Sequence, residues 1–147
     1  MPFALVIEDD SISASVVAHV LERKSYTTLS TVDPKEATRL CREFKIDVII
    51  ADLLLHSPFS GTDVALTVRR ECEQIPVLFV SGTPLEGWSE SDLSNIEALL
   101  PGRVEFLMKP FTAADLLTAV AKLLHRSYSE LDIRSAVQLA KSFRQGA

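Results

Sequence analysis

The chain has 147 residues and a net charge of −5, with 47% hydrophobic and 24% charged residues. This is the length of one domain, with enough apolar content to bury a core, and it excludes a disordered chain. The acidic balance argues against binding to nucleic-acid phosphates, so we expect no direct nucleic-acid contact. No apolar run approaches the roughly 18 residues of a membrane span.

The start of the chain and its cysteines indicate the compartment. Residues 1–10 carry no basic leader and turn acidic after seven residues, so we expect no signal peptide. Cys41 and Cys72 fall on apolar faces of predicted helices and are expected to be buried, reduced thiols. These features predict a cytoplasmic protein.

Strand-like and helix-like segments alternate five times along the chain. The predicted strands are residues 3–8, 26–31, 46–52, 75–81 and 103–108. The predicted helices are residues 11–23, 33–44, 61–72, 89–100 and 112–125. In the first helix Ile12, Val16 and Val20 form an apolar stripe. In the second, Asp33 is a good N-cap and Glu36 can complete a capping box.

The strands are apolar on both faces, which is typical of a parallel sheet covered by helices on each side. The pattern predicts an α/β fold: a doubly wound, five-stranded parallel sheet with strand order 2-1-3-4-5, flavodoxin-like, with an extra C-terminal helix.

The extra helix is predicted within residues 127–144, with Ser129 as its cap. Its shared apolar face is formed by Ile133, Ala136, Val137 and Ala140. We expect one domain over residues 1–125 and a helical extension over 126–147. This extension is expected to dock on its own domain or to form a homodimer; a linker to a further domain is the remaining alternative.

Polar side chains follow the predicted strands, at the edge of the sheet where ligands bind in this class of fold. They are Glu8, Asp9 and Asp10 after the first strand, Asp52 after the third, Ser81 after the fourth and Lys109 after the fifth. With the first and third strands adjacent, the carboxylates converge. Helix capping accounts for Asp10 but not for Asp52, which lies nine residues before Gly61.

Carboxylates this close would repel one another unless positive charge joined them. Lys109 and a divalent cation can supply it. Oxygen ligands favour Mg²⁺, or Mn²⁺, over zinc. A carboxylate beside such a cation, a lysine and a hydroxyl is a phosphoryl-transfer arrangement, in which the carboxylate can be the nucleophile.

Four motifs in order, "LVIEDD", "VIIAD", "VLFVSG" and "FLMKPF", resemble those of the response-regulator receiver domain, the CheY-like phosphoacceptor module of two-component signalling. The resemblance covers residues 3 to about 125. It implies Asp52 as phosphoacceptor, Asp9 as a direct Mg²⁺ ligand, Glu8 acting mostly through water, and the backbone carbonyl of Leu54 as a further ligand. A cis peptide bond is implied before Pro110.

The resemblance also implies a switch. Lys109 would pair with the phosphoryl group, Ser81 would hydrogen-bond it, and Phe106 would turn inward when Ser81 moves. The phosphodonor would be a histidine kinase or phosphotransfer protein. A downstream protein partner would read the face formed by the fourth helix, fifth strand and fifth helix. Beyond its own phosphorylation and dephosphorylation, the chain would not be an enzyme.

The chain departs from the family pattern in two loops. The family usually has Pro four residues after the acceptor and Gly eight after it, where this chain has His56 and Ser60. We expect a reshaped loop there, with His56 solvated. The segment between Ser81 and Lys109 is longer than usual and contains Trp88, which is expected to anchor this segment or, alternatively, to contact a partner.

Three other functions compete with a phosphorylated receiver. A haloacid-dehalogenase-type hydrolase needs a second Asp two residues after the nucleophile, where this chain has Leu54. A flavodoxin-type cofactor domain needs a phosphate loop where this chain has acidic residues. A pseudo-receiver would bind partners without phosphorylation.

Overall fold

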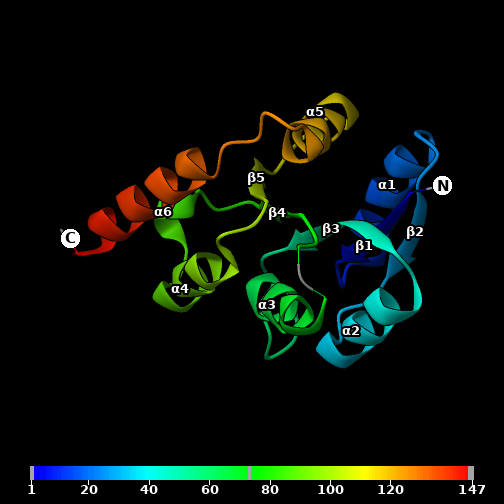
Figure 1. Ribbon diagram of the computed structural model, residues 1–147, viewed down its shortest axis with the longest axis horizontal. Coiled ribbons are helices and arrows are strands. Elements are labelled where there is room, and N and C mark those ends of the chain that lie inside the picture. The colour runs from blue at the N-terminus through cyan, green and yellow to red at the C-terminus, as the bar shows by residue number, and fades with distance from the viewer. Residues whose placement is uncertain (1, 73, 146–147) are drawn as a thin grey trace.

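The computed structural model describes residues 2–72 and 74–145 and contains a five-stranded parallel sheet with the order β2-β1-β3-β4-β5 (Figure 1). The strands are β1 Phe3–Ile7, β2 Thr27–Ser30, β3 Ile46–Asp52, β4 Val77–Ser81 and β5 Val104–Met108. The predicted strand order is confirmed. Met1 and residues 146–147, at the ends of the predicted domain and extension, lie outside the described residues.

Helices cover both faces of the sheet. They are α1 Ser11–Glu22, α2 Pro34–Glu43, α3 Gly61–Glu71, α4 Glu90–Leu99, α5 Ala113–Leu124 and α6 Glu130–Gln145, with a short 3₁₀ helix, η1, at Leu85–Gly87. The sheet face under α1 and α5 and the face under α2, α3 and α4 each carry a separate apolar cluster. Figure 1 shows α1 and α5 on one side and α2, α3 and α4 on the other.

The expected stripe of α1 is wrong by one helical position. Val17 and Leu21 are the buried residues of this helix, whereas Ile12 is 74% and Val16 53% exposed. Adjacent helical positions differ by about 100° around the helix axis. The stripe that contains Val17 and Leu21 is nearly as apolar as the predicted stripe, so the sequence alone does not decide between them. Val17 and Leu21 pack against the sheet, and Ile12 and Val16 therefore lie at the surface.

The start of α2 also differs from the prediction. Asp33 caps the helix by accepting from the Lys35 backbone N–H at 3.2 Å, as expected. Glu36 does not complete a capping box, because its carboxylate binds the guanidinium of Arg39 one turn later at 2.6 Å. The Glu36 carboxylate thus pairs with a charged side chain on the same exposed face and not with the N-cap backbone N–H.

Helix α6 docks on its own domain, as expected. Its buried residues Ile133, Val137 and Ala140 join the apolar cluster of the α2–α3–α4 face. Figure 1 shows α6 beside α4 and across the end of the sheet at β5. Homodimerisation through α6 stays a prediction.

The two cysteines lie on α2 and at the end of α3, against the same apolar cluster. Both thiols are free and half-buried rather than fully buried. Burial, and next to it the neighbouring Cys72, raises the pKa of the Cys41 thiol to about 12. Among the described residues, no helix combines the length and the apolarity that crossing a bilayer requires.

Candidate functional site

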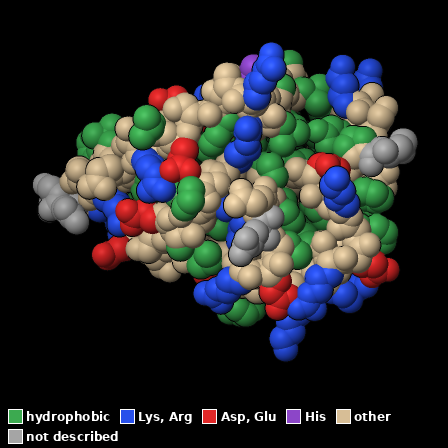
Figure 2. Space-filling view, viewed as in Figure 1, with side chains coloured by type: hydrophobic (Ala, Val, Ile, Leu, Met, Phe, Trp, Pro, Cys, Tyr) green, Lys and Arg blue, Asp and Glu red, His purple; other side chains and the backbone are tan. Residues whose placement is uncertain are grey.

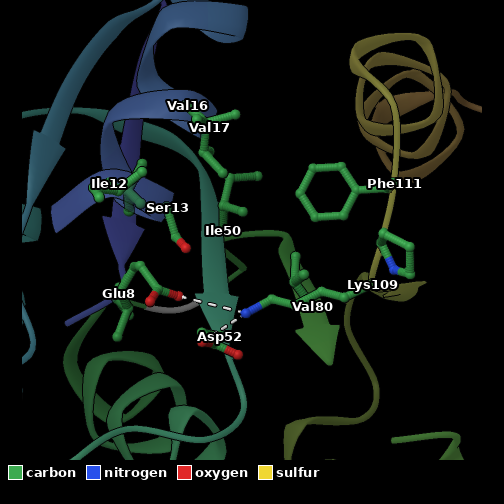
Figure 3. Close-up of a pocket in the computed structure, with 13 residues that line it drawn as sticks. Glu8, Ile12, Ser13, Val16, Val17, Ile50, Asp52, Val80, Lys109 and Phe111 are labelled. Atoms are coloured by element: carbon green, nitrogen blue, oxygen red, sulfur yellow. Dashed lines mark hydrogen bonds and ion pairs between the residues drawn. The ribbon is translucent and has the colours of Figure 1, made fainter. Parts of the chain in front are cut away.

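The carboxyl ends of β1 and β3 bring Asp52 and Glu8 together. Asp52 is the last residue of β3 and is 8% exposed. Lys109, directly after β5, places its Nζ 3.0 Å from Oδ2 of Asp52 and 4.0 Å from Oε2 of Glu8 (Figure 3). A buried carboxylate therefore has its charge offset by one ammonium group shared with a second acid. The structure brings these three residues together, as the sequence predicts, and their chemical roles stay predictions.

Glu8 is the most perturbed acid of this group. Its side chain is only 8% exposed. Burial first, and then a hydrogen bond with Asp52, raises the pKa of the Glu8 carboxyl to about 7. Two acids that share one lysine cannot both be ionised at low cost.

Asp9 and Asp10 have different partners. Oδ2 of Asp9 accepts from the His56 backbone N–H and lies 2.9 Å from His56 Nδ1, and the hydrogen bond from the backbone is the main reason why the pKa of the Asp9 carboxyl is lowered. The His56 side chain is 94% exposed, so the expectation of a solvated loop residue holds, with one bond added. Asp10 caps α1 through the Ser13 N–H at 3.0 Å, as expected.

These acids line a cavity of about 380 Å³ at the edge of the sheet, together with Leu54 and Lys109. Within residues 2–72 and 74–145, no three His, Cys, Asp or Glu side chains are grouped closely enough to hold a metal ion. Magnesium needs only one or two carboxylates and keeps several waters. The lining is dominated by crowded carboxylates with one ammonium, and the His56 imidazole is its one nitrogen ligand of the kind that zinc prefers. It therefore fits a hydrated Mg²⁺ better than zinc.

A second, apolar groove of about 500 Å³ opens next to Asp52. Ile12 and Val16 of α1 face Phe111, at the start of the loop into α5, across this groove (Figure 3). In Figure 2 hydrophobic side chains are visible at the surface between α1 and α5. The cis peptide bond before Pro110, which also lines the groove, is confirmed. Ile12 and Val16, which were expected to be buried, thus form the outer wall of this groove.

Ser81 ends β4 and is buried, but its hydroxyl is turned toward the following loop. Ser81 Oγ donates to the Thr83 carbonyl and accepts from the Thr83 N–H, both at 2.9 Å. Phe106 on β5 stacks on Phe79, with ring centroids 6.3 Å apart, and meets Trp88 edge-on at 5.4 Å. Ser81 and Phe106 thus lie on neighbouring strands, and the switch stays a prediction.

The reshaped loop after Asp52 ends in a firmly held helix start. Ser60 caps α3 in a capping box with Asp63. Ser60 Oγ and Thr62 Oγ1 both donate to Asp92 of α4, at 2.6 and 2.5 Å. Sequence reasoning missed this connection; the spacing Ser60-x-x-Asp63 was the one available signal, and nothing in the pattern pointed to Asp92.

Trp88 is buried, at 2% exposure, in the long segment after β4. Its ring also meets Phe79 edge-on, with centroids 6.1 Å apart, and its Nε1 donates to the Thr83 carbonyl at 3.0 Å. These contacts agree with the expected anchor, because a buried indole needs both packing and a partner for its N–H. Thr83, which accepts from both Ser81 and Trp88, was not anticipated.

The model of the response regulator receiver domain family matches residues 4–121. This chain therefore belongs to the receiver domains of response regulators in two-component signalling. The match is to a receiver family and indicates no enzyme family.

One similar protein is the uncharacterised transcriptional regulatory protein YrkP of Bacillus subtilis. It is 29% identical over 122 residues, which are 83% of this chain and 49% of YrkP. The chain thus spans about half the length of the curated relatives it matches.

Solved structures share the fold. The chemotaxis protein CheY4 of Vibrio cholerae has a TM-score of 0.71 at 23% identity, covering 84% of this chain and 99% of CheY4. The receiver domain of the sensor histidine kinase PA1611 of Pseudomonas aeruginosa has a TM-score of 0.65 at 21% identity, covering 83% of this chain and 96% of that domain. The PA1611 structure has a magnesium ion coordinated in its active-site cleft.

Proposed function

We propose that this receiver accepts a phosphoryl group on Asp52 from a histidine kinase or phosphotransfer protein, in the presence of Mg²⁺. The observation that carries the proposal is the buried Asp52 carboxylate, held 3.0 Å from Lys109 in a cavity that Glu8 and Asp9 also line. A nucleophilic carboxylate needs a neighbouring cation that offsets the charge of the incoming phosphoryl oxygens.

In the proposed step an Asp52 carboxylate oxygen attacks the phosphorus of a phosphohistidine. The P–N bond breaks, the imidazole leaves with its electron pair and takes up a proton, and Asp52 becomes an acyl phosphate. Lys109 stays within reach and pairs with the phosphoryl oxygens. Water later attacks the same phosphorus, the bond from phosphorus to the Asp52 oxygen breaks, and inorganic phosphate leaves while the carboxylate is restored. The chain's own chemistry is limited to these two steps.

Mg²⁺, or Mn²⁺ in its place, would offset phosphoryl charge when bound. Asp9, Asp52 and the backbone carbonyl of Leu54 would hold it, and Glu8 would act through water. The carboxylate lining of the cavity and the magnesium ion in the PA1611 receiver support this assignment. The Asp9–His56 contact must then yield one carboxylate oxygen to the metal.

We further propose that Ser81 turns from Thr83 to the phosphoryl group and that Phe106 moves into the space it leaves. Phosphorylation adds negative charge and acceptor oxygens, which attract a hydroxyl donor. Phe106 carries no hydroxyl, so its signal is one of packing. A protein partner on the α4–β5–α5 face would read this change.

The apolar groove beside Asp52 supports a protein as the phosphodonor. An exposed apolar surface next to a charged cavity is typical of protein-binding sites. YrkP is named a transcriptional regulator, but the match covers only 49% of it. We propose that the receiver, residues 1–125, and its extension, 126–147, contact proteins rather than nucleic acid. A cytoplasmic location stays a prediction.

The experiment is intact-mass measurement after incubation with acetyl phosphate and Mg²⁺. We expect a gain of one phosphoryl group in the wild type, none with a chelator and none in Asp52→Asn. Because Asn keeps the shape of Asp but cannot form an acyl phosphate, Asp52→Asn is a matched control. Labelling of Asp52→Asn to the wild-type level would refute the assignment.

The second candidate is a pseudo-receiver, which the His56 contacts with Asp9 favour, because they occupy the predicted direct metal ligand. A pseudo-receiver would gain no phosphoryl group and would bind no beryllofluoride, whereas a receiver with a short-lived phosphoryl group would still bind beryllofluoride.

A further inference from the structure

Helix α6 occupies part of the surface that a downstream partner is proposed to read. It packs on η1, α4 and β5, with Ile133, Val137 and Ala140 buried against that surface. Figure 1 shows α6 at the β5 side of the molecule, above α4. In this state a partner can reach the η1–α4–β5 surface only by displacing α6.

Polar contacts hold both ends of α6 on this surface. Near its end, Lys141 forms an ion pair with Glu97 of α4, and Arg144 Nη1 donates to the Trp88 carbonyl at 2.8 Å. Near its start, the Tyr128 hydroxyl donates to the Val104 carbonyl at 2.7 Å and accepts from its N–H at 2.8 Å. The contacts of Tyr128 satisfy backbone groups at the free edge of the sheet.

A short chain of hydrogen bonds connects Ser81 to α6. Ser81 Oγ and Trp88 Nε1 both donate to the Thr83 carbonyl, at 2.9 and 3.0 Å. The Trp88 carbonyl in turn accepts from Arg144. A serine hydroxyl has one proton, so Ser81 cannot donate to a phosphoryl oxygen and to Thr83 at the same time.

Packing connects the same elements by a second route. The Phe106 ring meets the Trp88 ring edge-on, at 5.4 Å between centroids. Trp88 shares an apolar cluster with Ile133 and Val137 of α6. A turn of Phe106 away from Trp88 therefore removes one of the aromatic contacts of Trp88. Both changes act on the residue whose carbonyl holds Arg144.

We propose that α6 is a built-in ligand of the η1–α4–β5 surface, and that occupation of the phosphoryl site weakens its hold through Ser81, Thr83 and Trp88. This inference rests on the proposed function. The partner that fits the freed surface is an amphipathic helix of the same chemistry as α6: small or branched apolar residues at Ile133, Val137 and Ala140 spacing, followed by basic residues for Glu97 and the Trp88 carbonyl.

The sequence supplies its own probe, because Trp88 is the single tryptophan. The full chain is mixed with beryllofluoride and Mg²⁺, and binding is verified separately by fluorine NMR. We expect a red shift of Trp88 emission and amide exchange in residues 133–141 that is at least about five-fold faster, a typical size for coupling between sites. Amides of α2, which lies outside the α4–β5–α5 face, serve as the internal reference. Bound beryllofluoride with unchanged exchange in α6 would overturn the inference.

Variants test the same coupling in reverse. Val137→Asp places a charge in the buried face of α6, and the milder pair Lys141→Ala with Arg144→Ala removes the polar contacts. Since coupling is reciprocal, each should bind beryllofluoride at least about five-fold more tightly than the wild type. Leu139→Asp, on the exposed face of the same helix, should bind like the wild type.

The two levels of the account fail in different ways. If Val137→Asp and the pair Lys141→Ala with Arg144→Ala bound beryllofluoride with the same affinity as the wild type, the role of α6 would be overturned. The proposed phosphoryl site would be unaffected. Absence of beryllofluoride binding in the wild type and in every variant would instead overturn the proposed function, and the coupling with it.

Discussion

Gly61 lies so close to Asp52 that a methyl group on it would come 2.1 Å from the Asp52 backbone oxygen. The Gly61 N–H also donates to the Leu53 carbonyl at 3.0 Å, so α3 begins directly against the end of β3. The family pattern has a glycine at position 60, and this chain has it at position 61. A glycine thus still stands where the chain approaches Asp52.

Gly61→Ala is expected to destabilise the fold by about 1–3 kcal/mol, the usual cost of forcing extra volume into a packed site. Its control is Gly82→Ala, where an added methyl group would meet nothing within 4 Å. Urea unfolding measures both. Equal midpoints for the two variants would show that the contact with Asp52 is easily relieved.

Removal of the Lys109 ammonium should slow phosphorylation. Lys109→Met keeps the length of the side chain but leaves Asp52 and Glu8 without the cation they share. The initial rate of mass gain with acetyl phosphate should fall by about 10²-fold, as for loss of one charge-stabilising donor. Lys122→Met, which loses only an ion pair with Glu105, should react at the wild-type rate. A Lys109→Met rate equal to that of the wild type would contradict the role of Lys109.

Loss of the His56 ring should tighten magnesium binding. The ring nitrogen lies 2.9 Å from the Asp9 oxygen that a metal would need. His56→Ala removes this competitor, and because the contact is exposed we expect only a two- to ten-fold gain in affinity by calorimetry, about 0.4–1.4 kcal/mol. His19→Ala, which changes an exposed histidine on α1, is the control. Weaker binding in His56→Ala would mean that His56 supports the site.

The Cys41 thiol should resist alkylation. Its pKa is raised to about 12, so the reactive thiolate is scarce in the folded chain at pH 8 and increases about tenfold per pH unit up to that value. In urea the same thiol should react roughly 10³-fold faster, with a plateau above pH 9. The rate with iodoacetamide is followed at the Cys41 peptide by mass spectrometry in the wild-type chain, so that Cys72 stays in place. A plateau near pH 9 in the folded chain would contradict the assigned environment.

The sheet and its polar edge could be predicted because both follow from local patterns. Apolar strands alternating with amphipathic helices define the parallel sheet, and the carboxyl ends of its strands place Asp52, Glu8 and Lys109 together. The α1 stripe was wrong because two apolar stripes one position apart differ little in sequence, and only contact with the sheet selects Val17 and Leu21.

The contacts of the loops and of α6 could not be predicted. The apolar face of α6 is visible in the sequence, but such a face does not say what covers it, so docking and dimerisation stayed open. Likewise the hydrogen bonds that Thr83 accepts depend on an irregular backbone between β4 and η1, for which no sequence period exists. The coupling of α6 to Ser81 therefore rests on the structure, whereas the resemblance alone already implied a switch at Ser81 and Phe106.

The most direct measurement locates the phosphoryl group. After incubation with acetyl phosphate and Mg²⁺, borohydride reduces an acyl phosphate on aspartate to homoserine, and peptide mass spectrometry identifies the position. The account predicts homoserine at position 52 alone. A reduced residue at position 8, 9 or 10, or an unmodified Asp52 in a chain shown to carry a phosphoryl group, would contradict it.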